Sequence, residues 1–346
     1  MACMIASRLV VNRFSGSSHC PARTRADRKR WHVDNTIDIV VIGSANMDLV
    51  LPVERLARAG ETISGGDLAL FPGGKGANQA CAVGKLGGRA AMIGFVGNDA
   101  FGAKLTASLD RAGVDTSGLG ISDRPTGCAC IYVLPDGENS IVISPGANAT
   151  VLPENVLSKL DLLHEGMYLL SQLEIPIATV TVALARAKAA GATTILDPAP
   201  VRALSSELLR NVDFLTPNQS EAAALLGDPD LEIRGFGEAL RAAERLLALG
   251  PAAAVLKLGS LGCYIAAGKV RAMVPGFEVS AVDTTAAGDI FNGAFAVALA
   301  EGEDVLGAAR FANAAAAISV TRPGAQSSIP SREEVEAFLS RRTAVA

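Results

Sequence analysis

Apolar runs alternate with helix-like segments along most of the chain. Residues 37–43 (IDIVVIG) are almost all apolar, which is typical of a strand buried on both faces of a parallel sheet. Further strand-like runs lie at 167–173, 193–197, 212–215 and 254–258, and helix-like segments lie at 178–190, 219–226, 238–249 and 308–319. This alternation predicts an α/β fold with a mainly parallel sheet layered by helices.

Two segments depart from the alternation. Residues 62–71 and 128–143 read as strands without intervening helices, and the second segment has a turn signal at 135–137 (PDG). They predict a small additional β-sheet. The chain shows no internal repeat and no long linker, so we expect one α/β domain with a β elaboration rather than two independent domains.

Length and charge narrow the class of protein. The chain has 346 residues, 49% of them hydrophobic, which is enough for a large buried core. Its net charge is −4, but residues 1–36 hold seven Arg or Lys against Asp27 and Asp34. The rest of the chain is therefore strongly acidic, which argues against a nucleic acid partner.

The first 36 residues differ in composition from the rest. They are rich in Arg and Ser and contain no acidic residue before Asp27. This pattern favours a disordered organelle transit peptide, with a plastid preferred over a mitochondrion; a non-functional extension of a cytoplasmic protein is the alternative. No uninterrupted apolar stretch reaches membrane-spanning length, so we expect no membrane partner.

Cysteine and histidine usage exclude several chemistries. The six cysteines show no C-x-x-C spacing, which is consistent with a reducing compartment, and Cys128 and Cys130 are expected to share one face of a strand as buried apolar residues. Only His164 lies outside the first 36 residues, in an expected loop. A catalytic base in this chain should therefore be a carboxylate.

Residues 283–289 (DTTAAGD) run directly into an apolar segment at 290–299 that predicts a helix. The N–H groups at a helix start lack partners and attract anions such as phosphate. The amides of Ala286, Ala287 and Gly288 would stabilise a negative charge there, and Asp289 would accept a proton from a hydroxyl. The alternative is that Asp289 simply caps the helix.

A second glycine-rich segment precedes a helix expected at 76–85. Residues 71–80 (FPGGKGANQA) hold three glycines within four residues, which lets the backbone approach a ligand closely. The segment fits neither G-x-x-x-x-G-K-[ST] nor G-x-G-x-x-G, so alone it supports no nucleotide site.

Together these segments resemble the signatures of the ribokinase family of carbohydrate kinases. The signature-like segments are 73–79 and 283–289, and weaker similarity in the family's order lies at 43–48, 217–221, 257–260 and 324–326. The resemblance implies a ribokinase-like three-layer α/β/α domain over residues 37–342. It also implies lid strands from about 49–71 and 126–144, which cover the sugar and can pair two subunits into a homodimer.

For the sugar, the resemblance implies a site in the front half of the chain. Asp48 would accept bonds from the sugar hydroxyls, and Glu174 would complete the pocket; a turn acid and a surface charge are the alternative readings. A dry pocket of this kind rejects sugars that leave its polar groups unmatched. The other sugar-binding positions implied are Asn46, Met47, Gly74, Lys75, Gly76, Ala77 and Asn78.

For ATP, the resemblance implies contacts from the rear half. Asn218 would approach the phosphates and Glu221 would order water on Mg²⁺, although residues 218–221 also fit a helix capping box. Asn313 would lie near the adenine. The turn at Lys257, Leu258, Gly259, Ser260, Leu261 and Gly262 would contact the nucleotide, but Lys257 departs from the small polar residue common in bacterial ribokinases.

A monovalent cation is also implied by the resemblance, beside the anion site. Carbonyl oxygens and one carboxylate suit a weakly hydrated ion such as K⁺. The matching positions are Asp283, Thr285, Ser319, Arg322, Gly324 and Ser328.

The expected activity is ATP-dependent phosphorylation of the 5-hydroxyl of D-ribose, with Asp289 as general base. Two alternatives stay open. One is a kinase of fructose, a deoxyribose or a nucleoside such as adenosine, and the other is a catalytically silent sugar-binding regulator with the same fold.

Overall fold

The computed structural model describes residues 37–343, and the transit peptide predicted over 1–36 lies outside them. Within the described residues no helix is long and apolar enough to cross a membrane. The described residues all belong to one compact unit.

The main sheet has nine strands in the order β13-β12-β11-β10-β9-β8-β1-β4-β5. Neighbours from β11 to β5 pair in parallel, whereas β12 and β13 are antiparallel additions at one edge. The strands are β1 Ile39–Ile42, β4 Ala90–Gly97, β5 Leu119–Ser122, β8 Tyr168–Ser171, β9 Thr193–Leu196, β10 Phe214–Leu215, β11 Ala253–Lys257, β12 Gly262–Ala267 and β13 Val270–Pro275. The mainly parallel sheet predicted from the sequence is therefore confirmed.

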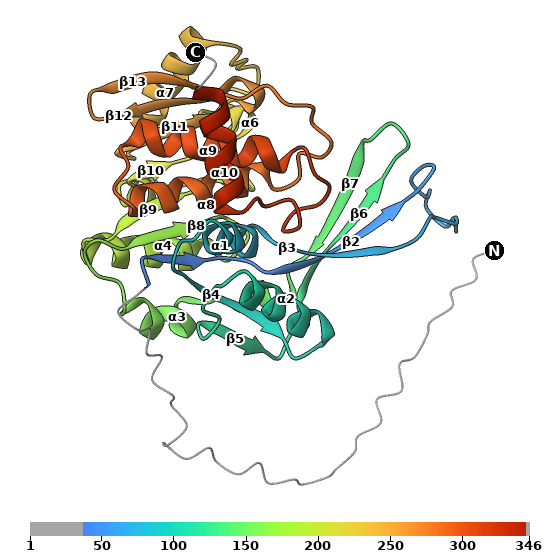
Figure 1. Cartoon of the computed structure of the whole chain (residues 1–346). Helices are drawn as coiled ribbons and strands as arrows, with labels where there is room; N and C mark the ends of the chain where they lie inside the picture. The colour runs from blue at the N-terminus through green and yellow to red at the C-terminus, as the bar shows by residue number, and fades with distance from the viewer. Residues whose placement is uncertain (1–36, 344–346) are drawn as a thin grey trace, which may run out of the picture. The chain divides into compact units, whose positions relative to one another are not determined.

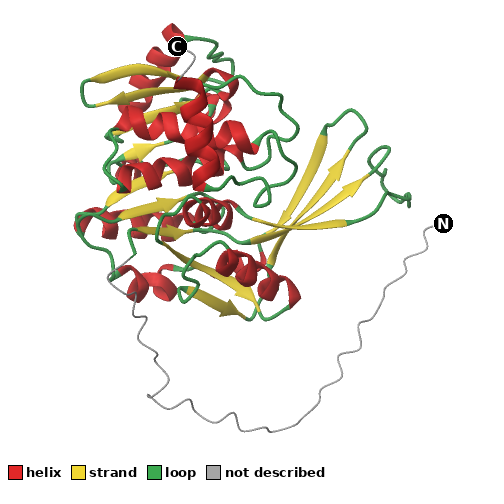
Figure 2. Ribbon diagram, viewed as in Figure 1, coloured by secondary structure: helices red, strands yellow, loops and turns green. Residues whose placement is uncertain are grey.

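Helices cover the sheet, as Figures 1 and 2 show. In one group α1 contacts α2 and α8, α8 contacts α9, and α9 contacts α10. Elsewhere α4 contacts α3 and α5, and α6 contacts α7. Their bounds are α1 Lys75–Lys85, α2 Ala100–Arg111, α3 Pro153–Leu160, α4 Ile177–Ala189, α5 Ser206–Leu209, α6 Gln219–Leu225, α7 Phe236–Leu247, α8 Ala287–Ala300, α9 Val305–Ser319 and α10 Arg332–Thr343. Short 3₁₀ turns lie at Gly146–Thr150 and Gly259–Leu261.

Helix α8 lies at the centre of the buried core. Its residues from Asp289 to Ala298 are all buried, and Phe295 packs edge-on against Phe214 of β10 at 5.4 Å between ring centroids. A helix that is apolar on every side must be enclosed by protein, which explains why α1, α9 and the sheet surround it. The position of Asp289 in the first turn of α8 is therefore fixed by packing.

A smaller sheet projects from the body in the order β3-β2-β6-β7 (Figure 1). Its strands are β2 Asn46–Pro52, β3 Ala69–Gly73, β6 Gly127–Val133 and β7 Asn139–Ser144. The sheet is mixed, because β2 pairs in parallel with β6, while β2–β3 and β6–β7 are antiparallel.

Two expectations about this sheet need correction. The strand predicted from residue 62 begins only at Ala69, because residues 62–68 contain two glycines and no strand pairs with them. Cys128 and Cys130 do share a face, opposite Ser144 and Val142 of β7, but both are only partly buried. Cys128 packs against the edge of the core without being enclosed by it, so the expectation of fully buried thiols is wrong.

The parallel strands deliver polar residues to one edge of the main sheet. Strand β11 ends on Lys257, Asp197 directly follows β9, and Ser44 lies two residues after β1. Ligands of open α/β sheets bind outside these carboxyl ends. The helix starts of α1 and α8 face the same edge, as the contacts of their first turns show below.

Candidate functional site

Asp289 is held in a buried position by the first turn of α1. Its side chain is 4% exposed and accepts hydrogen bonds from Asn78 Nδ2 at 3.0 Å and Gln79 Nε2 at 3.1 Å. The structure thus brings together the two glycine-containing motifs, which are about 200 positions apart in the sequence. The capping alternative for Asp289 is wrong, because α8 is preceded by Ala286 and no side chain caps it.

Burial and nearby charges set the ionisation of Asp289. Burial raises the pKa of Asp289 to about 6, against the opposing effect of the Lys75 ammonium. In return, Asp289 raises the pKa of Lys75 above its usual range. The carboxylate is therefore ionised at neutral pH yet titrates close to it, which is the range expected of a general base.

The turn that starts α8 has an unusual backbone. Ala286 has φ 60° and is the one described residue other than glycine with positive φ. This left-handed conformation costs about 1–2 kcal/mol for a residue with a Cβ. It turns the chain so that Ala287 and Gly288 line a cavity, although the Ala287 N–H already donates to the Thr284 carbonyl oxygen at 3.2 Å. An anion would have to replace that bond.

The expected sugar-binding residues converge on Glu174. Its Oε2 accepts from Ser44 Oγ at 2.5 Å, from the Lys75 N–H at 3.1 Å and from Asn46 Nδ2 at 3.5 Å. Glu174 therefore bridges the end of β1 and the start of α1 and is not a surface charge.

Close backbone approach explains the glycines of this region. A Cβ at Gly74, whose φ is 88°, would lie 2.6 Å from the Asn46 backbone nitrogen, and one at Gly76 would lie 2.6 Å from that of Ser44. The expected site residues Met47, Ala77 and Asn78 are buried beside them.

Asp48 is the second carboxylate with a strongly shifted pKa. Burial first, and then the charges of Glu174 and Asp289, raise the pKa of Asp48 to about 7. A Cβ at Gly73 would lie only 2.1 Å from Asp48 Oδ2, so any other residue at position 73 would displace the Asp48 carboxylate. Asp48 thus lies within the electrostatic range of both Glu174 and Asp289.

Residues 218–221 form the predicted capping box. Asn218 Oδ1 accepts from the Glu221 N–H at 2.8 Å, and Glu221 Oε2 accepts from the Asn218 N–H at 2.7 Å. Burial raises the pKa of Glu221, whereas the nearby Lys257 ammonium lowers it. The second carboxylate oxygen, Oε1, has no part in the capping box, so the cap and a role on metal-bound water are compatible.

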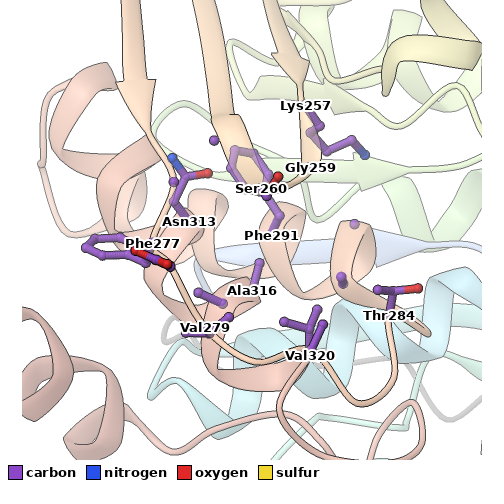
Figure 3. Close-up of a pocket in the computed structure, with 17 residues that line it drawn as sticks. Lys257, Gly259, Ser260, Phe277, Val279, Thr284, Phe291, Asn313, Ala316 and Val320 are labelled. Carbon is purple, nitrogen blue, oxygen red and sulfur yellow. The ribbon is translucent and has the colours of Figure 1, made fainter. Parts of the chain in front are cut away.

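A cavity of about 360 Å³ opens beside the start of α8 (Figure 3). Lys257, Gly259, Ser260 and Gly262 line it, together with Asn313 of α9, whereas the buried Leu258 and the exposed Leu261 do not. Apolar walls come from Phe277, Val279, Phe291 and Val320. An apolar slot with polar groups at its ends suits a nucleotide base and its phosphates.

The residues expected around a monovalent cation join two loops. Asp283 accepts from the N–H groups of Thr285 at 2.9 Å and Gly324 at 2.7 Å. Burial raises the pKa of Asp283, but these hydrogen bonds outweigh it and hold the pKa below its usual value.

The remaining side chains of the expected cation set are already engaged. The hydroxyls of Ser319 and Ser328 donate to the carbonyls of Ala316 and Ala325, and Arg322 pairs with Glu334. Backbone oxygens and the Asp283 carboxylate are therefore the donors that this region offers to an ion.

Two buried residues at the site did not stand out from the sequence. Gln79 Nε2 donates to both Asp289 and Asp197, at 3.1 and 3.0 Å, and Gln79 Oε1 accepts from Gln172 Nε2 at 2.6 Å. Asp197 is 2% exposed and also pairs with Lys257. The available signal for Asp197 was its position at the end of the strand predicted at 193–197.

Comparisons with known proteins agree with this arrangement. The profile described as pfkB family carbohydrate kinase matches residues 36–332. The chain is 42% identical to the ribokinase of Bacillus subtilis over 304 residues, which is 88% of this chain and 99% of the relative. The ribokinase structure from Thermotoga maritima has a TM-score of 0.79 and 43% identity, and covers 88% of this chain and 99% of its own. The structure of Arabidopsis thaliana ribokinase complexed with ribose and ATP has a TM-score of 0.80 and 34% identity, with 88% and 99% covered.

The raised pKa of Asp48 predicts a pH-dependent stability difference. The pKa of Asp48 rises from 3.8 in the unfolded chain to about 7 in the folded protein, so its stabilising contribution is complete below pH 3.8 and is lost as pH rises through 7. Asp48→Asn, which stays neutral, should gain roughly 2 kcal/mol relative to the parent protein between pH 5 and pH 8. Urea unfolding at both pH values measures this.

The matched control is Asp67→Asn, because Asp67 is exposed in the loop between β2 and β3 of the small sheet. Asp67→Asn removes the same charge from an exposed position, so subtracting its effect isolates the contribution of burial at Asp48. A constant free-energy difference for Asp48→Asn across this range would contradict the shifted pKa.

Proposed function

Because the chain belongs to the pfkB family of carbohydrate kinases, we propose that it is a ribokinase, which transfers the terminal phosphoryl group of ATP to the 5-hydroxyl of D-ribose. The observation that carries the proposal is the 3.0 Å contact between Asn78 and Asp289. It joins the expected sugar site to a buried carboxylate at the edge of the cavity. Ribokinase relatives covering most of the chain support this choice of sugar.

The sugar would lie between the small sheet and the carboxyl edge of the main sheet. Asp48 accepts hydrogen bonds from ribose hydroxyls, while Asn46 and Lys75 supply donors held in place by Glu174. A sugar that lacks a matching hydroxyl leaves a buried partner unpaired, which costs about 1–3 kcal/mol per group. This penalty is the proposed basis for selecting ribose.

In the transfer step, Asp289 accepts the proton of the ribose 5-hydroxyl. The oxygen forms a bond to the γ-phosphorus as the bond from that phosphorus to the β,γ-bridging oxygen breaks, and ADP leaves. The Asn78 and Gln79 side chains orient the carboxylate, and the N–H groups at the start of α8 stabilise the charge on the transferring group.

The nucleotide would fill the cavity with its base at the Asn313 end and its phosphates beside Gly288. Mg²⁺ would be held by the phosphates and by water ordered on Glu221, and when bound it neutralises phosphate charge. The free Oε1 of the Glu221 carboxylate fits that role. K⁺ would be held by Asp283 and by backbone carbonyls of residues 319–328, a donor set that suits a weakly hydrated cation.

We also propose that the small sheet pairs two subunits into a homodimer. Ile141 and Ile143 of the edge strand β7 are 51% and 49% exposed, and register places Ile143 opposite Ala129, which pairs with Asp48. The apolar face therefore continues from the sugar site to an open edge. Such an edge tends to find a partner.

The activity is tested by release of ADP from ATP with Mg²⁺ and K⁺ present. We expect turnover with D-ribose to exceed that with 2-deoxyribose, fructose or adenosine by at least an order of magnitude in kcat/KM, because unmatched hydroxyl partners penalise the others. A preference for adenosine would contradict the pocket interpretation. Absence of ADP release with every sugar would favour a silent sugar-binding protein.

The general base is tested by Asp289→Asn. Turnover should fall by roughly 10²–10⁴-fold, the usual scale for a lost base, while ribose affinity measured by calorimetry changes little. In the parent protein, kcat/KM should fall as pH drops through about 6, because the base must be ionised. Near-normal turnover of the variant would remove Asp289 from this role.

The dimer is tested by Ile141→Glu, which places a charge on the exposed apolar face. Sedimentation velocity should show a dimer for the parent protein and a monomer for the variant. Ile121→Glu is the matched control, because Ile121 is 65% exposed on β5 of the main sheet. A monomeric parent protein, or a variant that stays dimeric, would contradict the proposed interface.

A further inference from the structure

The backbone of Lys257 joins the end of β11, at the proposed nucleotide site, to the start of α6. Lys257 is the last residue of β11, its N–H donates to the Pro217 carbonyl at 2.8 Å, and it forms an isolated bridge with Asn218. The strand end is therefore anchored directly beside the capping box of α6.

The Lys257 side chain is largely buried and held by one carboxylate. It is 12% exposed, and its Nζ donates to Asp197 Oδ1 at 3.1 Å. An ammonium carries three donors, and this bond uses one. Asp197 in turn is fixed by Gln79, which also holds Asp289. The position of the ammonium is therefore coupled to that of the expected base.

The ammonium lies against the start of α8. A Cβ at Gly288 would lie 3.3 Å from Lys257 Nζ, so a side chain there would press on the ammonium and shift it. Lys257 also lines the cavity, at the opposite end from Asn313 and Phe277 (Figure 3). If the nucleotide base occupies the Asn313 end, the phosphates reach the Lys257 end.

We propose that Lys257 is a catalytic residue whose ammonium binds the oxygens of the transferring phosphoryl group, and that Asp197 positions it. The inference rests on the proposed function. No proton leaves Lys257: the proton of the acceptor hydroxyl goes to Asp289, while the fixed positive charge offsets the charge that develops on the phosphoryl oxygens. A charge placed in advance in a site with little water is more effective than one in solvent.

The alternative is that Lys257 only neutralises the buried Asp197. Two observations favour catalysis. The donors not used by Asp197 lie beside an open cavity rather than a packed core, and the charge of Lys257 reaches Glu221, whose pKa it lowers. A lysine that only neutralised Asp197 would not need to lie beside the cavity or close to Glu221.

The test compares nucleotides with and without a γ-phosphate. Lys257→Met should lower kcat by about 10²–10³-fold, the scale for losing one group that stabilises the transition state. In calorimetry with Mg²⁺ and no sugar, the variant should lose at least tenfold more affinity for AMP-PNP, a hydrolysis-resistant ATP analogue, than for ADP. Equal losses for AMP-PNP and ADP would overturn the proposal.

Two further variants separate catalysis from charge balance. Lys257→Met combined with Asp197→Asn leaves no uncompensated buried charge, so it remains informative if the single variant does not fold. The double variant should stay as slow as the single one, and recovery of turnover would show that Lys257 only balances Asp197. Lys269→Met, in the exposed turn after β12, is the matched control and should behave like the parent protein.

The test of Lys257 can fail independently of the test for ribokinase activity. A parent protein that binds both nucleotides but phosphorylates no ribose would contradict the ribokinase activity alone. The comparison of AMP-PNP with ADP does not depend on the sugar and would still decide the role of Lys257.

Discussion

The hydrogen bonds that Asn78 and Gln79 donate to Asp289 are the interaction on which the site depends. They require α1 and α8 to begin at the same edge of the sheet, although about 200 residues separate them. Buried carboxylates are costly unless they are hydrogen-bonded. The two amides therefore stabilise an acid that the apolar helix α8 would otherwise place in the core, and they fix its direction.

Charge balance around this contact explains the two lysines. Asp48, Glu174, Asp197 and Asp289 bring several carboxylates into one region, and repulsion among them is part of why the pKa of Asp48 rises to about 7. Lys75 offsets this charge from the sugar side, and Lys257 from the nucleotide side. The result is an Asp289 whose pKa of about 6 keeps it ionised at neutral pH without making it a weak base.

Patterns among residues that are close in the sequence predicted much of the fold and part of the site. The apolar run at 37–43 predicted a buried strand, and the Asn218–Glu221 pair predicted a capping box, because both depend on near neighbours. The alternative that Asp289 only caps a helix is wrong, because its partners come from α1 and no local pattern shows them. Gln79 was missed for the same reason, whereas Asp197 had its position at the end of a predicted strand as a signal. The strand predicted from residue 62 failed for lack of a pairing partner.

The relation between Lys257 and Gly288 shows how one position constrains another. Because a Cβ at Gly288 would lie 3.3 Å from the Lys257 Nζ, a side chain there would push the ammonium away from the start of α8. Asp197 holds the ammonium from the other side, and Gln79 passes that restraint to Asp289. Asp289 and the Lys257 ammonium are therefore positioned by one connected set of buried hydrogen bonds, and a change in the position of either would shift the other.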